Sequence, residues 1–110
     1  MDPIKVINVF TQWLQYNRKI FLPTVWQNLP KLEESLSELE DDQLFPIAHT
    51  ISKWCAKYQL LEKLKQEVLD YDNNYLPEDN LEEIETIEDY IQLLYRSILN
   101  CYNDLAIASK

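Results

Sequence analysis

Glycine is absent from this chain of 110 residues. An average chain of this length contains about eight glycines. Without glycine, the sequence lacks the Gly-rich loops that cradle phosphates, the dinucleotide-binding fingerprint and the Gly-flanked nucleophile turn of hydrolases. Helices must also end without the usual glycine after their last turn, so Asn, Pro or a tight loop must take its place.

Residue types that carry catalysis are also few. His49 is the only histidine, and no metal-binding motif such as HExxH surrounds it. Cys55 lies on roughly the opposite face of a helix from His49, at about 100° per residue, so the two are poorly placed for a Cys–His pair. Cys55 and Cys101 fit no zinc or redox spacing and are expected to be reduced, packed thiols. We therefore predict a protein that is not an enzyme and uses no metal and no cofactor.

One motif resembles the start of a calcium loop. Asp70-x-Asp72-x-Asn74 has the spacing with which an EF-hand presents oxygen ligands. An EF-hand also needs Gly at its sixth position and a bidentate Glu at its twelfth, and here these positions hold Tyr75 and Leu81. The sequence therefore favours an acidic connector between two helices over a calcium site.

Long apolar runs and strands are missing as well. No stretch reaches eighteen apolar residues, and the N-terminus lacks the pattern of a signal peptide, so we expect a soluble, cytoplasmic protein without membrane contact. No run alternates with the period of a strand. We predict one domain over residues 1–110, an all-α antiparallel bundle of four to five helices with its acidic connector near residues 71–80.

Apolar residues at helical spacing place the first helices. The first opens at Asp2-Pro3, an N-cap followed by a tolerated proline, and ends at Leu22-Pro23. The second runs from about residues 28–30 to about residue 40. The third covers about residues 43–70, as one helix or two.

The last helix has the strongest period, and it begins near Asn80 or restarts at Thr86. Its heptad spacing fits either an intermolecular coiled coil or an apolar stripe inside a bundle. We favour the bundle, because no segment sustains four heptads, and expect a monomer or weak homodimer. The stripe consists of Ile84, Ile87, Ile91, Leu94, Ile98, Cys101 and Leu105. The residues predicted to be buried across the bundle are Trp13, Leu36, Ile51, Trp54, Ile91, Leu94 and Ile98.

Charge is segregated along the chain. Residues 1–65 carry eight basic and eight acidic side chains, whereas residues 66–110 carry two and eleven, so the net charge of −9 lies in the second part. Ten acids between residues 67 and 89 occur without a Lys or Arg between them. This block is either a solubilising face or an electronegative surface that attracts a basic protein, and direct nucleic-acid binding by it is disfavoured. The basic residues Arg18, Lys19, Lys53, Lys57, Lys63 and Lys65 form only a modest cluster, diluted by neighbouring acids.

The candidate partner-binding residues follow from this charge and from one aromatic residue. Trp26 lies one place off an apolar stripe in a proline-bounded segment, and if exposed it would be an interface anchor. The acidic candidates are Glu78, Asp79, Glu82, Glu83, Glu85, Glu88 and Asp89. They would serve an inhibitor or immunity-type protein that neutralises a basic partner, such as a nuclease or a nucleic-acid-binding protein.

The segment Ile51–Leu64, ISKWCAKYQLLEKL, within residues 47–71, resembles the helix–tip–helix segment of bacterial effector-associated domains. In that segment, a helix of apolar and aromatic residues ends in basic residues, and a Leu-x-x-Leu pattern then follows in the next helix. At the turn, where the family usually has Gly, this sequence has Tyr58-Gln59. The resemblance implies a small helical adaptor, similar in role to death-fold domains, that recruits an effector protein by domain–domain contact.

Overall fold

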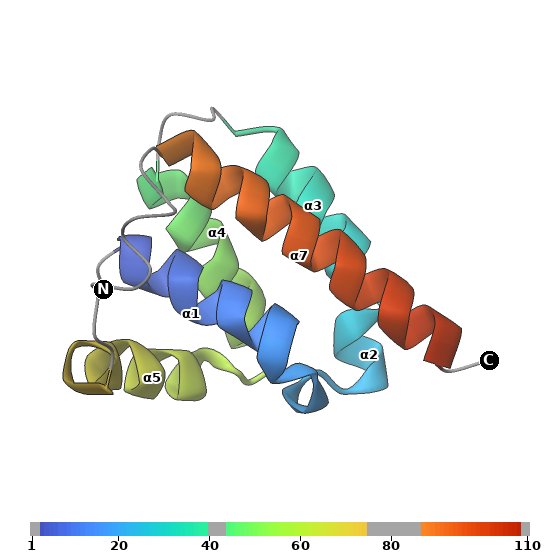
Figure 1. Ribbon diagram of the computed structural model, residues 1–110, viewed down its shortest axis with the longest axis horizontal. Helices are drawn as coiled ribbons and strands as arrows, with labels where there is room; N and C mark the ends of the chain where they lie inside the picture. The colour runs from blue at the N-terminus through green and yellow to red at the C-terminus, as the bar shows by residue number, and fades with distance from the viewer. Residues whose placement is uncertain (1–2, 40–43, 75–86, 109–110) are drawn as a thin grey trace.

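The computed structural model describes residues 3–39, 44–74 and 87–108, and within them all side chains except those of residues 71–74, 87 and 88. Every regular element in this part of the chain is helical, which confirms the predicted all-α fold (Figure 1). The elements in chain order are α1 (Pro3–Tyr16), the 3₁₀ turn η1 (Arg18–Ile20), α2 (Pro23–Trp26), α3 (Leu29–Ser37), α4 (Leu44–Lys57), α5 (Leu61–Asn74) and α7 (Ile87–Ala108).

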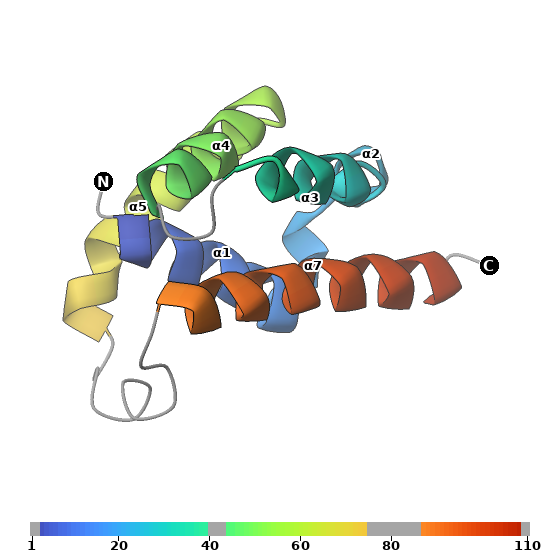
Figure 2. The same ribbon diagram turned by 90° about the horizontal axis from the view of Figure 1, so that it is seen from above.

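Helix α1 is the centre of the arrangement. It packs against α4, α5 and α7, while α3 bridges α4 and α7. Figure 2 shows α7 on one side of the molecule and α3 and α4 on the other, with α1 between α4 and α7. Because three helices pack against it, α1 is buried around more of its circumference than a helix that packs on only one side. Its buried apolar residues are Val6, Ile7, Val9, Phe10, Trp13 and Leu14.

Aromatic rings occupy the centre of the core. The ring centroid of Phe10 lies 6.0 Å from that of Phe21 and 5.7 Å from that of Trp54, with the planes near perpendicular in both pairs. Such edge-to-face pairs add attraction beyond the burial of their surface. All seven residues predicted to be buried are buried: Trp13, Leu36, Ile51, Trp54, Ile91, Leu94 and Ile98.

The first helix is shorter than the sequence predicts. We expected it to end at Leu22-Pro23, but α1 ends at Tyr16, and Asn17 leaves the helical conformation with φ −134° and ψ 44°. In an uninterrupted helix, residues 10 and 21 would be about 16 Å apart along the axis. The break turns the chain so that the Phe21 ring packs on Phe10 instead, and this burial favours the early end.

The third apolar segment forms two helices, which settles the alternative left open by the sequence. α4 and α5 are separated by a tight turn in which Gln59 has a left-handed conformation, φ 63°. The Leu60 N–H donates to the Cys55 carbonyl at 2.7 Å, and the Gln59 N–H donates to the Ala56 carbonyl at 3.2 Å. This is the Schellman pattern that glycine usually completes. In a chain without glycine, Gln59 adopts the left-handed position.

Helix α7 uses its heptad stripe inside the bundle. Ile91, Leu94, Ile98 and Cys101 are buried, and α7 contacts both α1 and α3. The stripe is therefore an intramolecular seam, as predicted for a bundle. The two predicted starts of this helix, Asn80 and Thr86, lie outside the described residues.

Candidate functional site

Trp26, the aromatic candidate for partner binding, belongs to the core. Only 7% of its surface is exposed, and its ring centroid lies 5.8 Å from that of Tyr102 on α7. The exposure that an interface anchor requires is therefore not met. Trp26 instead holds the short helix α2 against α7.

The acidic candidates are described only at their C-terminal end. Asp89 is exposed near the start of α7, and Glu88 lies in the same helix, but its side chain is outside the described set. The remaining candidates lie outside the described residues: Glu78, Asp79, Glu82, Glu83 and Glu85. Trp26 packs on Tyr102, thirteen residues beyond Asp89 along α7, so these two described candidates do not share one site.

Two other acids of the block contribute to the fold. The Trp13 indole N–H donates to Glu67 Oε2 at 2.8 Å, and Lys63 Nζ lies 3.5 Å from the same oxygen. Asp70 accepts a long hydrogen bond of 3.3 Å from Gln66 one turn earlier. Glu67 thus joins α5 to α1, and this carboxylate is occupied by interactions within the chain.

The residues with reactive side chains are poor candidates for chemistry. His49 is exposed on α4. Cys55 is fully buried, and burial raises the pKa of its thiol to about 12. Burial likewise raises the pKa of Cys101 to about 11, although Arg18 opposes the shift. Both thiols stay protonated near neutral pH, so neither supplies a thiolate nucleophile.

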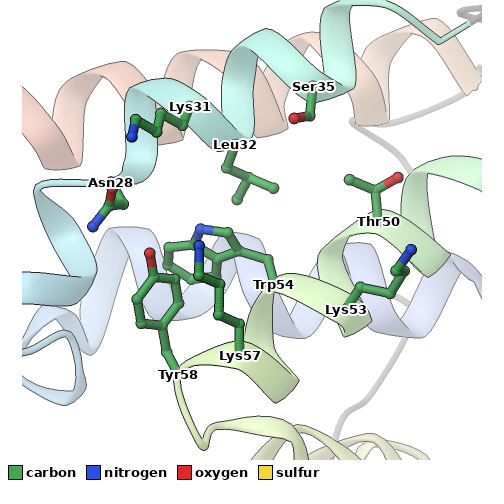
Figure 3. Close-up of a pocket in the computed structure, with 9 residues that line it drawn as sticks. All are labelled: Asn28, Lys31, Leu32, Ser35, Thr50, Lys53, Trp54, Lys57 and Tyr58. Atoms are coloured by element: carbon green, nitrogen blue, oxygen red, sulfur yellow. The ribbon is translucent and has the colours of Figure 1, made fainter.

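The described helices form one groove that the sequence did not predict. It lies between α3 and α4, on the side away from α7, and has a volume of about 480 Å³ (Figure 3). Leu32 and Trp54 are buried beneath it, and Tyr58 is half-buried at one end. The lining residues are Asn28, Lys31, Leu32, Ser35, Thr50, Lys53, Trp54, Lys57 and Tyr58.

Three lysines give the groove a positive rim. Lys31 reaches it from α3, and Lys53 and Lys57 reach it from α4 (Figure 3). All three side chains are exposed, and none forms an ion pair with a carboxylate in the part of the chain that the structure describes. Lys57 Nζ lies 5.5 Å from the centre of the Tyr58 ring, within the range of a cation–π contact.

The polar neutral residues of the groove are partly committed to the backbone. The Asn28 side-chain amide donates to the Thr24 carbonyl at 2.6 Å, and the Thr50 hydroxyl donates to the Pro46 carbonyl at 2.9 Å. The lysines are therefore the main donors that the groove offers to a ligand. An ammonium group attracts carboxylates and phosphates as a point charge, without the planar geometry of arginine.

Folding divides the basic cluster seen in the sequence. Arg18 pairs with Asp104 at 2.5 Å, and Lys63 pairs with Glu67, so these two cations act within the chain. Lys53 and Lys57 remain at the groove, where Lys31 joins them. A signal was present in the sequence: residues 43–61 contain these two lysines and no Asp or Glu. The contribution of Lys31, on another helix, had no such signal.

Comparison of the chain with protein-family models, with curated proteins and with solved structures finds no match. Among the described residues, no helix is long and apolar enough to cross a membrane, and no group of three or more His, Cys, Asp or Glu residues is placed to hold a metal ion.

Proposed function

We propose that this protein is a non-enzymatic protein–protein interaction module of the adaptor type, and that the groove between α3 and α4 is its binding face. The groove supports this proposal because it combines a buried apolar floor with exposed charges around it. Protein interfaces have the same anatomy, in which aromatic and apolar anchors at the centre are enclosed by a polar rim.

The composition of the groove favours a protein segment as its ligand. Tyr58, half-buried at one end, offers most of the apolar contact, because Leu32 and Trp54 expose only 2% and 9% of their surface, and the three lysines attract negative charge. A protein segment that carries an apolar side chain beside acidic ones would match both features. Association with such a segment would be faster at low salt, because exposed charges steer the encounter.

The resemblance to effector-associated domains supports the same proposal. The segment that carries the resemblance, Ile51–Leu64, supplies Lys53, Trp54, Lys57 and Tyr58 to the groove. In the family, this part of the domain belongs to modules that recruit effectors by domain–domain contact. The segment that carries the resemblance therefore also supplies part of the proposed binding face.

Charge segregation in the sequence supports a second candidate. As an acidic inhibitor or immunity-type protein, the chain would engage a basic partner through the acids between residues 78 and 89. Asp89 is exposed, as that function requires. The adaptor is preferred because the groove provides apolar contact as well as charge.

Site-specific photo-crosslinking in the native host distinguishes the two candidates. A photoreactive residue is placed at Ser35 in the groove, at Gln92 one turn beyond Asp89, or at Lys65 on α5, which supplies no residue to the groove. A discrete protein adduct at Ser35 that is absent at Lys65 is the result expected for the adaptor. An adduct at Gln92 alone would support the inhibitor instead, and no adduct at either position would contradict both.

A further inference from the structure

We propose that the groove binds the acidic segment of a second copy of this chain, residues 72–89, so that the protein associates head to tail with itself. This inference rests on the proposed function, because it uses the groove as the binding face. It adds the identity of the occupant, which the proposed function leaves open.

The receiving side has charge of one sign only. Lys31, Lys53 and Lys57 all line the groove (Figure 3), and no carboxylate is among the residues that line it. On a chain with a net charge of −9, residues 43–61 are a stretch with two lysines and no acid. A carboxylate-rich segment brought to the groove meets three cationic side chains and no carboxylate among the lining residues.

The donating side is its complement. Residues 72–89 contain eight acids and no Lys or Arg, and Leu76, Leu81 and Ile84 lie among these acids. The segment therefore carries carboxylates for the lysine rim and apolar side chains for the half-buried Tyr58 ring at one end of the groove. Glu67 and Asp70 precede this segment on α5, where both accept hydrogen bonds within the chain.

The two helices that border the acidic segment have their described ends away from the groove. Figure 2 shows the end of α5 and the start of α7 away from the side on which α3 and α4 lie, and helix α1 lies between α4 and α7. Docking of the segment within its own chain would leave the protein monomeric, so a measurement of mass in solution distinguishes it from docking on a second copy.

The geometry of this contact fixes the kind of assembly. Each copy offers one groove and one segment, so the contact is heterologous and adds copies in one direction, as an open chain or a closed ring. Repulsion between copies that each carry −9 opposes it. At about 0.1 M salt the Debye length is about 10 Å, which screens whole-molecule repulsion more than close contacts. We therefore expect weak association that increases with protein concentration.

The test measures the mass of the full chain in solution by sedimentation equilibrium. A groove variant carries K31E, K53E and K57E, and a segment variant carries E82K, E83K and E85K. We expect the wild-type mass to rise with concentration and each variant to lose that rise. The matched control reverses three exposed cations outside the groove, K19E, K65E and R96E, with the same change in net charge as the groove variant, and should retain the rise. Circular dichroism establishes that each variant is folded.

Mixing the two defective variants tests the direction of the contact. The groove variant keeps an intact segment, and the segment variant keeps an intact groove. An equimolar mixture should therefore form a complex of one copy of each, although neither variant associates alone. A mixture that stays monomeric, or a groove variant that associates like the wild type, would overturn the inference.

The outcomes also distinguish this inference from the proposed function. A wild-type chain that remains monomeric, together with a Ser35 adduct to a different protein, overturns self-association and leaves the adaptor function in place. If Ser35 forms no adduct with any protein, itself included, both fail.

Discussion

Polar side chains around α1 have partners on neighbouring helices, whereas the lysines around the α3–α4 groove form no ion pair with a described carboxylate. On the first side, Trp13 donates to Glu67 on α5, and Gln15 donates to Ser97 on α7 at 3.2 Å. Arg18 both pairs with Asp104 and donates to the Leu14 carbonyl at the end of α1.

The difference separates groups that hold the fold from groups that are free to bind. A partly buried polar group must be bonded, because an unsatisfied one costs about 1–3 kcal/mol. A solvated lysine has no such requirement and contributes little to stability. The α1 contacts should therefore matter for folding and the groove for binding, and each substitution below tests that division.

The largest effect is expected in the aromatic core. Phe10→Ala removes a fully buried ring that contacts Phe21 and Trp54, and should cost about 3–5 kcal/mol of the free energy of unfolding. Urea unfolding followed by circular dichroism measures this loss, with Lys53→Ala in the groove as the control. A comparable loss in both variants would remove the distinction between the two regions.

The second effect is a dependence of the free energy of unfolding on pH, caused by the buried Cys55 thiol of α4. The Cys55 pKa is about 12 in the folded state, against about 8.5 for a free thiol. Above pH 8.5 the unfolded state therefore loses a proton that the folded state keeps, so stability falls as pH rises, by about 2 kcal/mol at pH 10. Unfolding of wild type and Cys55→Ala at pH 8 and pH 10 isolates this part, and equal pH dependence in both would contradict it.

The next effect concerns the bond between α5 and α1. Glu67→Ala leaves the Trp13 indole N–H without its acceptor, and should destabilise the protein by about 1.5 kcal/mol. Glu67→Gln retains an acceptor oxygen and should cost less. If the two substitutions cost the same in urea unfolding, the charge of Glu67, and not its hydrogen bond to Trp13, is the important property.

A smaller effect of opposite sign is expected at the turn between α4 and α5. Gln59 has φ 63°, a conformation that costs a residue with a Cβ roughly 1 kcal/mol relative to glycine. Gln59→Gly should therefore raise the melting temperature. Ala56→Gly, at an exposed helical position in the last turn of α4, is the control and should lower it.

Periodicity predicted the buried residues well, because the helical period alone decides which side chains share a face. The end of α1 could not be read in this way, since Phe21 contacts Phe10 only after the chain turns back. The sequence could not predict the groove for a related reason, since Lys31 and Lys53 are distant in sequence and meet only in the fold. The sequence also could not show that Arg18 pairs with Asp104 whereas Lys53 forms no such pair. The sequence leaves the exposure of Trp26 open, because the contact with Tyr102 that buries it is tertiary.

The smallest effects on folding are expected at the groove lysines. Lys31→Gln and Lys53→Gln should change the free energy of unfolding by less than about 0.5 kcal/mol, because both ammonium groups are solvated. Lys57→Gln should cost slightly more, about 0.5 kcal/mol, since Lys57 lies over the Tyr58 ring. Urea unfolding measures all three, alongside sedimentation equilibrium of the same samples. Variants that keep wild-type stability while losing association would show that the lysines act in binding. A loss of more than about 1 kcal/mol in the free energy of unfolding of any variant would show that the groove lysines stabilise the fold instead.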